Sequence, residues 1–349
     1  MRVDIASLVR PGIARLVPYK NARAEFDSSA DIFLNANENS YGAPITGNFN
    51  RYPDPLQRSL KVRLACLNAT HEANCFIGNG SDEVIDLLIR SFCEPGIDNV
   101  IICPPTYGMY EVSARINGVE VREAPLTTHF QLDTDAIVNC ADKNTKLIFL
   151  CSPNNPTGNA LTRADVMRIV DAVHALVVVD EAYWDYSSSA SYIGEIERHN
   201  NVVVMRTLSK AWGLAGLRIG MAFADSEVIA VLNKVKPPYN VNAVSQQLAL
   251  DAVENESIVQ QWIRLTIRER ENVRVLLEEL PIVRTVFPSD ANFLLVRVTS
   301  ATEAHGALLR HGIVVRDRST MLGCEQCVRI TIGTSEENNR LIDVLKQCK

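Results

Sequence analysis

The sequence predicts an α/β fold, with a large domain around a mostly parallel central sheet and a smaller α+β domain. Its 349 residues exceed what one small core needs, so two packed units are expected. Apolar runs alternate with helical patterns up to about residue 240. After KVKPPYNVN at 234–242, the pattern changes to long charged helices followed by short strands.

The predicted large domain spans residues 36–242. Its strand-like runs are apolar on both faces, as in buried parallel strands that helices cover; they lie at 99–103, 146–151, 174–180 and 201–207. A helix is expected at 162–174, because Thr162 followed by Asp165 resembles a capping box. These elements together predict one open α/β sheet.

The predicted small domain spans residues 243–349. Residues 243–280 have a helical pattern with alternating charge, and a last helix with acidic residues in its first turn is expected at 335–348. Strands are expected between these helices, at 291–298, 312–317 and 327–333. The N-terminal segment, residues 1–35, is too short to fold alone and is expected to pack on the small domain.

Composition and charge argue against several kinds of partner. The formal net charge is −6 and charges of both signs are mixed along the chain, so neither a nucleic acid nor a membrane surface is an expected partner. The first residues have no apolar signal core, which predicts a cytoplasmic protein. Of nine cysteines, Cys324 and Cys327 have C-x-x-C spacing but no second pair or nearby histidine. Buried thiols and no metal site are therefore expected.

The most informative stretch is RTLSKAWGLAGLRIG at 206–220. A lysine that bonds to a carbonyl carbon must lose its proton easily, and nearby positive charge and desolvation both lower its pKa. Lys210 fits this requirement, and Thr207, Ser209 and Arg218 around it are able to donate to a phosphate dianion. The alternative is a solvated surface lysine beside a glycine-rich turn.

Polar side chains follow two predicted strands at the edge where open α/β sheets bind ligands. Asp180 ends an apolar strand, and a carboxylate there can pair with a protonated ring nitrogen. Tyr183 and Asn155 are placed to bind an oxygen of the same ring, Asn155 from the turn-forming stretch SPNNPTGNA at 152–160. The alternatives are a helix N-cap for Asp180 and a plain loop for Asn155.

A glycine-rich turn opens an amphipathic helix in GNGSDEVIDLLIR at 78–90. The backbone N–H groups of Gly80, Ser81 and Asp82 would point at an anion at the helix N-terminus, and Ser81 can also be the N-cap. Tyr107, which follows a predicted strand, is able to stack on a flat aromatic ring or to pack in the core.

In this order, the motifs resemble those of the fold-type I aminotransferases that depend on pyridoxal 5′-phosphate (PLP), over essentially the whole chain. The resemblance implies that Lys210 holds PLP as a Schiff base and moves a proton between the substrate carbon and the cofactor carbon. It also implies that Asp180 pairs with the ring nitrogen, and that Asn155 and Tyr183 bind the ring oxygen.

One branch of this superfamily is indicated by further stretches. LVPYKNAR (16–23), LNANENSYGAP (34–44), RYPDP (51–55), GIVVRD (312–317) and CVRITIG (327–333) resemble the histidinol-phosphate aminotransferase group, although Ser40 stands where the group usually has proline. The resemblance implies a homodimer that converts imidazole acetol phosphate and glutamate to histidinol phosphate and 2-oxoglutarate.

The same resemblance assigns further binding residues. Tyr52 is expected to reach across the dimer interface to the partner's cofactor phosphate. Arg329 is expected to bind an acidic group of the substrate, helped by Arg316, Tyr19 and Asn37, because a planar guanidinium suits carboxylate and phosphate alike. The alternative for the two arginines is a pair of exposed strand charges.

Other activities on the same scaffold stay open. Phosphothreonine decarboxylases of cobalamin synthesis and aromatic amino acid aminotransferases are similar to this group, and release of carbon dioxide from phosphothreonine would distinguish the first. A PLP-binding regulatory domain is a third alternative, but such regulators carry a DNA-binding unit for which this chain has no room. The sequence gives no role for Trp184.

Overall fold

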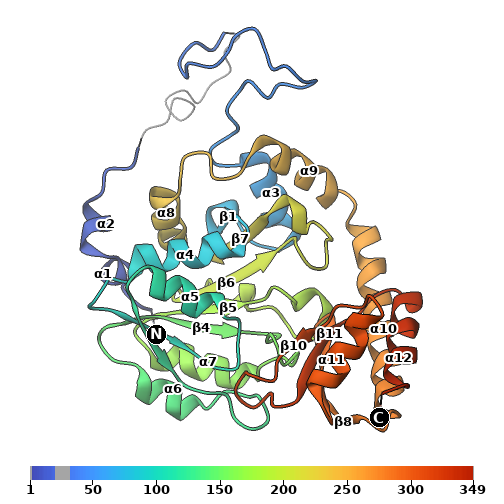
Figure 1. Ribbon diagram of the computed structural model, residues 1–349. Helices are drawn as coiled ribbons and strands as arrows, with labels where there is room; N and C mark the ends of the chain where they lie inside the picture. Colours follow the sequence, from blue (N-terminus) through green and yellow to red (C-terminus); the bar gives the residue numbers. More distant parts are fainter. Residues whose placement is uncertain (1, 20–31, 349) are drawn as a thin grey trace.

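The computed structural model describes residues 2–19 and 32–348, so part of LVPYKNAR lies outside the described residues. The chain forms two sheets that lie side by side, each covered by helices (Figure 1). The larger sheet has seven strands in the order β1-β7-β6-β5-β4-β2-β3, and the smaller has four in the order β10-β11-β9-β8. This arrangement confirms the predicted α/β fold with a second, smaller unit.

The large sheet is parallel except for β7, which is antiparallel to both of its neighbours. The predicted strands are found within one or two residues of their expected bounds. Apolar side chains on both faces explain this agreement, since the four predicted strands are buried between two layers of helices, whereas the edge strand β3 is largely exposed. The strands are β1 (Cys75–Asn79), β2 (Asn99–Ile102), β3 (Glu120–Glu123), β4 (Thr145–Cys151), β5 (Leu176–Asp180), β6 (Val202–Thr207) and β7 (Ile219–Ala224).

Helices cover both faces of this sheet, and alternate residues of β5 show the two layers: Val177 and Val179 face one core, and Leu176 and Val178 face the other. The first core includes α3 (Arg58–Leu67), α6 (Thr134–Cys140), α7 (Arg163–Ala172) and α9 (Ala243–Val253). The second includes α1 (Ile5–Leu8), α4 (Ser81–Phe92), α5 (Met109–Ile116) and α8 (Ser226–Val235).

Helix α7 begins where the sequence predicts, but its predicted capping box is absent. The Thr162 side chain makes no capping hydrogen bond. Its hydroxyl and its backbone N–H both donate to Gln131 Oε1 instead, at 3.0 and 2.9 Å. A long-range partner has therefore displaced the local one.

The smaller unit is an antiparallel sheet with α10 (Glu256–Glu278), α11 (Ala301–Arg310) and α12 (Ser335–Leu345). Its strands are β8 (Val283–Val286), β9 (Phe293–Val298), β10 (Arg316–Asp317) and β11 (Cys327–Thr331). β10 is much shorter than predicted. α12 starts with a capping box between Thr334 and Glu337, which fits the acidic first turn expected there. None of the described helices is long and apolar enough to cross a membrane.

The expectation that the N-terminal segment packs on the small unit is wrong for the described residues. Val3, Ile5 and Leu8 are buried in the core that includes α4 and α8 of the large unit. Asn200 fixes this position, because its side chain exchanges two hydrogen bonds with the Val3 backbone at 2.9 and 2.7 Å. The shortness of the segment indicated only that it must pack on another part of the chain. Its apolar side chains pack on the large unit.

The boundary predicted at residue 243 also differs from the structure. Ala249 and Val253 of α9, and Ile263 in the first half of α10, belong to the large unit's core. Val273 and Leu277, further along α10, belong to the core of the smaller unit. One long helix thus connects the units, and we infer that the boundary lies within it, between Ile263 and Val273.

Candidate active site

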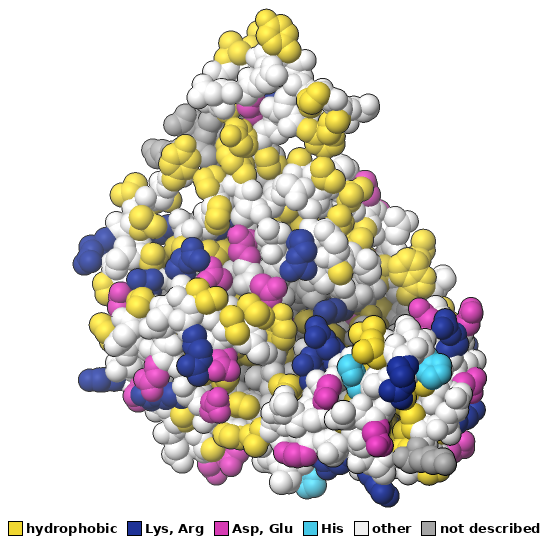
Figure 2. Space-filling view, viewed as in Figure 1, with side chains coloured by type: hydrophobic (Ala, Val, Ile, Leu, Met, Phe, Trp, Pro, Cys, Tyr) yellow, Lys and Arg dark blue, Asp and Glu magenta, His cyan; other side chains and the backbone are white. Residues whose placement is uncertain are grey.

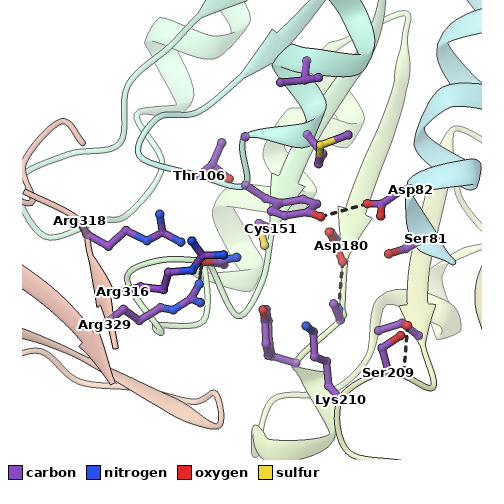
Figure 3. Close-up of a pocket in the computed structure, with 18 of the residues that line it drawn as sticks. Ser81, Asp82, Thr106, Cys151, Asp180, Ser209, Lys210, Arg316, Arg318 and Arg329 are labelled. Carbon is purple, nitrogen blue, oxygen red and sulfur yellow. Dashed lines mark hydrogen bonds between the residues drawn. The ribbon is translucent and has the colours of Figure 1, made fainter. Parts of the chain in front are cut away.

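A cavity of about 500 Å³ lies between the carboxyl edge of the large sheet and the smaller unit. The large unit lines it with residues that follow β1, β2, β4, β5 and β6, and the smaller unit adds Arg316, Arg318, Met321 and Arg329 (Figure 3). In the space-filling view, basic side chains gather in the middle of this face, between the two units (Figure 2).

Asp180 ends β5 and is 4% exposed. Its Oδ2 accepts a hydrogen bond from Tyr110 Oη at 2.6 Å, and its Oδ1 accepts one from the Ala182 N–H at 3.0 Å. Burial raises the pKa of Asp180 to about 6, although these two hydrogen bonds act to lower it. A carboxylate in such a place favours a positively charged partner in the cavity.

Lys210 follows β6 and lines the same cavity. Part of its side chain is accessible to solvent through this cavity. Burial lowers the pKa of Lys210, and the positive charge of Arg329 lowers it further. Its Nζ lies 5.6 Å from the centre of the Tyr183 ring, which itself packs edge-on against Phe293 of β9 at 5.1 Å. This is the environment expected for a reactive amine rather than for a solvated surface lysine.

Glycines let the backbone pack closely at the start of α4. A Cβ on Gly220 of β7 would lie 2.2 Å from the Ser81 backbone N, so β7 passes directly behind the helix N-terminus. Gly80 has φ +80°, and a Cβ there would lie 2.6 Å from Arg218 Nη2. The close approach brings the Arg218 guanidinium next to the first turn of α4, whose N-cap has no side-chain hydrogen bond, and this arrangement suits an anion. Gly80, not Ser81, is the N-cap.

The other predicted anion-binding residues lie beside this turn. Ser209 lines the cavity, and its backbone N–H donates to Thr207 Oγ1 at 3.1 Å. The Thr207 hydroxyl donates to the Ile219 carbonyl at 3.1 Å, so it secures the turn between β6 and β7. Asp82 lies 3.4 Å from Arg218 Nη2 and accepts a hydrogen bond from Tyr107 Oη at 3.0 Å. Asp82 therefore orients both a cation and an aromatic ring at the cavity.

The remaining predicted residues of the cavity are Asn155, Arg316 and Arg329. Arg329 Nη1 donates a hydrogen bond to Asn155 Oδ1, which links the loop after β4 to the smaller unit. Burial lowers the pKa of Arg329. Arg316 lies directly opposite Arg329 in the β10–β11 pair, and both guanidinium groups point into the cavity (Figure 3).

Gly80 lies next to the cavity without lining it, and three other predicted residues lie away from it in the single chain. Tyr19 is 77% exposed, and Asn37 is exposed with φ +54°. Tyr52 is 51% exposed and stacks on Tyr239 with ring centres 4.5 Å apart. Tyr52 and Asn37 instead line a separate hollow together with Tyr239 and the start of α9. The segment that carries them projects from the body near α3 and α9 (Figure 1).

Sequence reasoning missed Arg318 and Tyr110. Arg318 stands two residues after Arg316, and the two-residue period of a strand would have placed both side chains on one face. Tyr110 offers no such signal, because a tyrosine on the inner face of α5 has the pattern of any core residue. Only the assembled fold brings its hydroxyl to Asp180.

Trp184 has a structural position next to the site. The Arg206 guanidinium lies 3.7 Å from the centre of its ring, and its Nε1 donates to the Ser189 carbonyl at 2.8 Å. Arg206 also pairs with the buried Glu181 at 2.8 Å. This cluster fixes the chain that follows Asp180.

The C-x-x-C pair is buried, as expected. Cys324 and Cys327 have no exposed surface, and burial raises the pKa of the Cys324 thiol to about 12. A thiol in this environment stays protonated and unreactive. Within residues 2–19 and 32–348, no group of three or more His, Cys, Asp or Glu is placed to hold a metal ion.

Comparison with known proteins agrees with this site. The family described as "Aminotransferase class I and II" matches residues 24–345. Histidinol-phosphate aminotransferases of Cytophaga hutchinsonii and Parabacteroides distasonis are 48% and 49% identical over 346 residues, which cover 99% of this chain and 99% of each relative.

Among solved structures, the histidinol-phosphate aminotransferase from Sinorhizobium meliloti in complex with PLP has a TM-score of 0.79 at 23% identity, and covers 89% of both chains. The L-threonine-O-3-phosphate decarboxylase from Porphyromonas gingivalis has a TM-score of 0.72 at 25% identity, and covers 85% of this chain and 90% of its own. The fold is thus shared with another activity, whereas the sequence identity to the two relatives is far higher. The chain belongs to the histidinol-phosphate aminotransferase family, within the class I and II aminotransferases.

Proposed function

We propose that this chain is a PLP-dependent aminotransferase that interconverts histidinol phosphate and 2-oxoglutarate with imidazole acetol phosphate and glutamate. One observation carries the proposal: Lys210, the buried Asp180 and an arginine cluster meet in a single cavity. No single motif would support it as well, because each part alone also occurs in ordinary structural roles.

The donors around the cavity fit PLP. Asp180, buried at the sheet edge, suits a protonated ring nitrogen, and Asn155 and Tyr183 line the same cavity with polar groups that suit a ring oxygen. The α4 N-terminus with Ser81, Ser209 and Arg218 suits a phosphate. Tyr107 lines the cavity with its hydroxyl held by Asp82, so its ring is available for stacking. We therefore assign these residues to the cofactor.

When bound, PLP supplies an electron sink next to the carbon that carries the amino group. Lys210 supplies the base, because its lowered pKa favours the neutral amine that can take a proton on Nζ and return it. Asp180 would pair its negative charge with the ring nitrogen and so favour the protonated form of that nitrogen. Asp82 keeps Arg218 and Tyr107 in position.

Substrate binding falls to the arginines of the smaller unit. Histidinol phosphate carries a phosphate ester and no carboxylate, whereas glutamate carries carboxylates, and a guanidinium binds both. We propose that Arg329 and Arg316 bind this anionic group in both half-reactions. Tyr19 and Asn37 stay proposed ligands by family likeness, since they lie outside the cavity of the single chain.

We also propose a cytoplasmic homodimer in which Tyr52 serves the partner's site. The segment that carries Tyr52 and the adjoining helices α3 and α9 support this, because they expose large apolar side chains; they are Leu34, Tyr41, Ile45, Phe49, Val62, Val244 and Leu248. All nine cysteines are free, which suits a reducing compartment.

Subunit mixing tests the shared site. Chains with Lys210→Ala and chains with Tyr52→Phe should each be inactive or impaired, and mixed dimers should regain activity because one site then has both native residues. A mixture of Lys210→Ala with Asp180→Ala chains is the control. It should gain no activity, since Lys210 and Asp180 serve the cavity of their own chain and each site of the mixed dimer then lacks one of them. Full activity from a monomer in sedimentation would refute the homodimer.

The reaction itself is tested by following both products. Histidinol phosphate and 2-oxoglutarate should give glutamate and imidazole acetol phosphate in equal amounts, and phosphothreonine should release no carbon dioxide. Decarboxylation of phosphothreonine, or use of phenylalanine as readily as histidinol phosphate, would contradict the proposed substrate and leave PLP chemistry in place.

A further inference from the structure

Arg318 is a charged group that the site described so far does not use. It follows β10, lines the cavity and points into it beside Arg316 and Arg329 (Figure 3). Its Nε is buried and has no hydrogen-bond partner among the described residues. Arg329 Nε is in the same condition. Buried donors without a partner are costly in a folded protein, and at a cavity they indicate an absent ligand.

Strand geometry sets the three arginines on one face. Arg316 and Arg329 are directly opposite each other in the antiparallel pair, so their side chains project to the same side. The ladder continues by one bond, from the Arg318 N–H to the Cys327 carbonyl at 2.9 Å. Arg318 is two residues from Arg316, and therefore shares its face. Asp317, between them, projects to the other side and accepts a hydrogen bond from the Ser319 N–H at 2.8 Å.

The positive charges of this face are not neutralised within the chain. In the part of the chain that the structure describes, no carboxylate forms an ion pair with Arg316, Arg318 or Arg329. Burial lowers the pKa of Arg318, and the charge of Arg316 lowers it further. Three like charges on one face favour an anion that carries more than one charge.

A phosphate monoester fits this face better than a carboxylate does. One carboxylate has a single charge and two oxygens, which one guanidinium satisfies. A phosphate dianion has three terminal oxygens with about two charges at neutral pH, enough for three guanidinium groups. On the basis of the function proposed above, we propose that Arg318 joins Arg316 and Arg329 in binding the substrate phosphate, and so determines the preference for phosphorylated amines.

Half-reaction kinetics of the Arg318→Gln holoenzyme test this assignment. Loss of one charge-assisted contact should lower kcat/KM for histidinol phosphate about 10- to 100-fold. Unphosphorylated histidinol should be unaffected, and glutamate should change by less than about threefold, because Arg329 still binds its carboxylate. Arg284→Gln is the matched control, since Arg284 is an exposed arginine of the same small sheet outside the cavity. Equal losses for histidinol and histidinol phosphate, or no loss at all, would overturn the assignment.

Binding of inorganic phosphate to the holoenzyme separates this assignment from the proposed function. Calorimetry should show weaker binding to Arg318→Gln than to the native enzyme and to Arg284→Gln. If the native enzyme does not prefer histidinol phosphate to histidinol, the proposed function fails, yet weaker phosphate binding by Arg318→Gln would still support the anion site. The assignment of Arg318 would be overturned if the native enzyme did not bind phosphate, or if Arg318→Gln and Arg284→Gln bound it equally.

Discussion

The two walls of the cavity differ in how their charges are satisfied. On the wall of the large sheet, Asp180 is hydrogen-bonded to Tyr110 and Ala182, and Asp82 to Arg218 and Tyr107. On the opposite wall, the buried Nε atoms of Arg318 and Arg329 have no hydrogen-bond partner within residues 2–19 and 32–348. The first wall is organised before anything binds, as a permanent cofactor requires. The second leaves its charges for an anion that enters and leaves with each turnover.

The largest effect is expected from Lys210→Ala on the organised wall. Removal of Nζ takes away both the attachment point and the proton carrier, so turnover should fall by several orders of magnitude. The other donors remain, and PLP should still bind, which absorbance of the dialysed protein would show. A fall of less than tenfold would mean that another group moves the proton.

On the substrate wall, Arg329→Ala should have the next largest effect. Loss of a charge-assisted contact to a desolvated anion costs roughly 2–5 kcal/mol, so kcat/KM should fall by a factor of tens to thousands for histidinol phosphate and for glutamate. Arg316→Ala should affect the phosphorylated substrate more. Unchanged cofactor absorbance in both variants would show that this wall binds the substrate and not the cofactor. Loss of PLP from either variant would contradict the distinction between the two walls.

Asp180→Asn should stabilise the cofactor-free chain against unfolding. Because the folded pKa of Asp180 is raised from 3.8 to about 6, the native state binds more protons than the unfolded state between these values, and stability falls as the pH rises through about 6. At pH 7.5 the buried charge costs up to about 3 kcal/mol, so Asp180→Asn should raise the free energy of unfolding. Denaturation at pH 7.5 and pH 4.5 should show this gain shrinking at the lower pH.

Tyr110→Phe should have the smallest effect: loss of its hydrogen bond to Asp180 should lower the free energy of unfolding by about 1–2 kcal/mol. Without the Tyr110 hydroxyl, the pKa of Asp180 should rise further, and the acidic limb of the activity profile should move to higher pH. Tyr192→Phe is the control, because Tyr192 is also buried, at 4% exposure, but lines a different cavity away from Asp180. The same shift in both variants would point to a general loss of packing.

The organised wall was largely predictable from sequence. Asp180 ends one apolar strand and Asn155 lies just after another, and the carboxyl ends of parallel strands meet at one edge of an open sheet. Tyr110 was not predictable, since its partner is 70 residues away and nothing in α5 marks its hydroxyl. Placement of the N-terminal segment failed for a similar reason, because the partner of Val3 is Asn200. Local patterns indicate elements and edges, whereas contacts across the fold decide which side chains meet.

Borohydride reduction of the holoenzyme and subsequent peptide mapping test the central claim most directly. Among the lysines that the structure describes, three have a pKa lowered by burial, namely Lys210, Lys61 and Lys236. Only Lys210 of these three lines the cavity with Asp180, whereas Lys236 donates to the Pro55, Pro237 and Pro238 carbonyls. The pyridoxyl group should be found on Lys210 Nζ. A pyridoxyl group on Lys61, Lys236 or any other lysine would contradict the account.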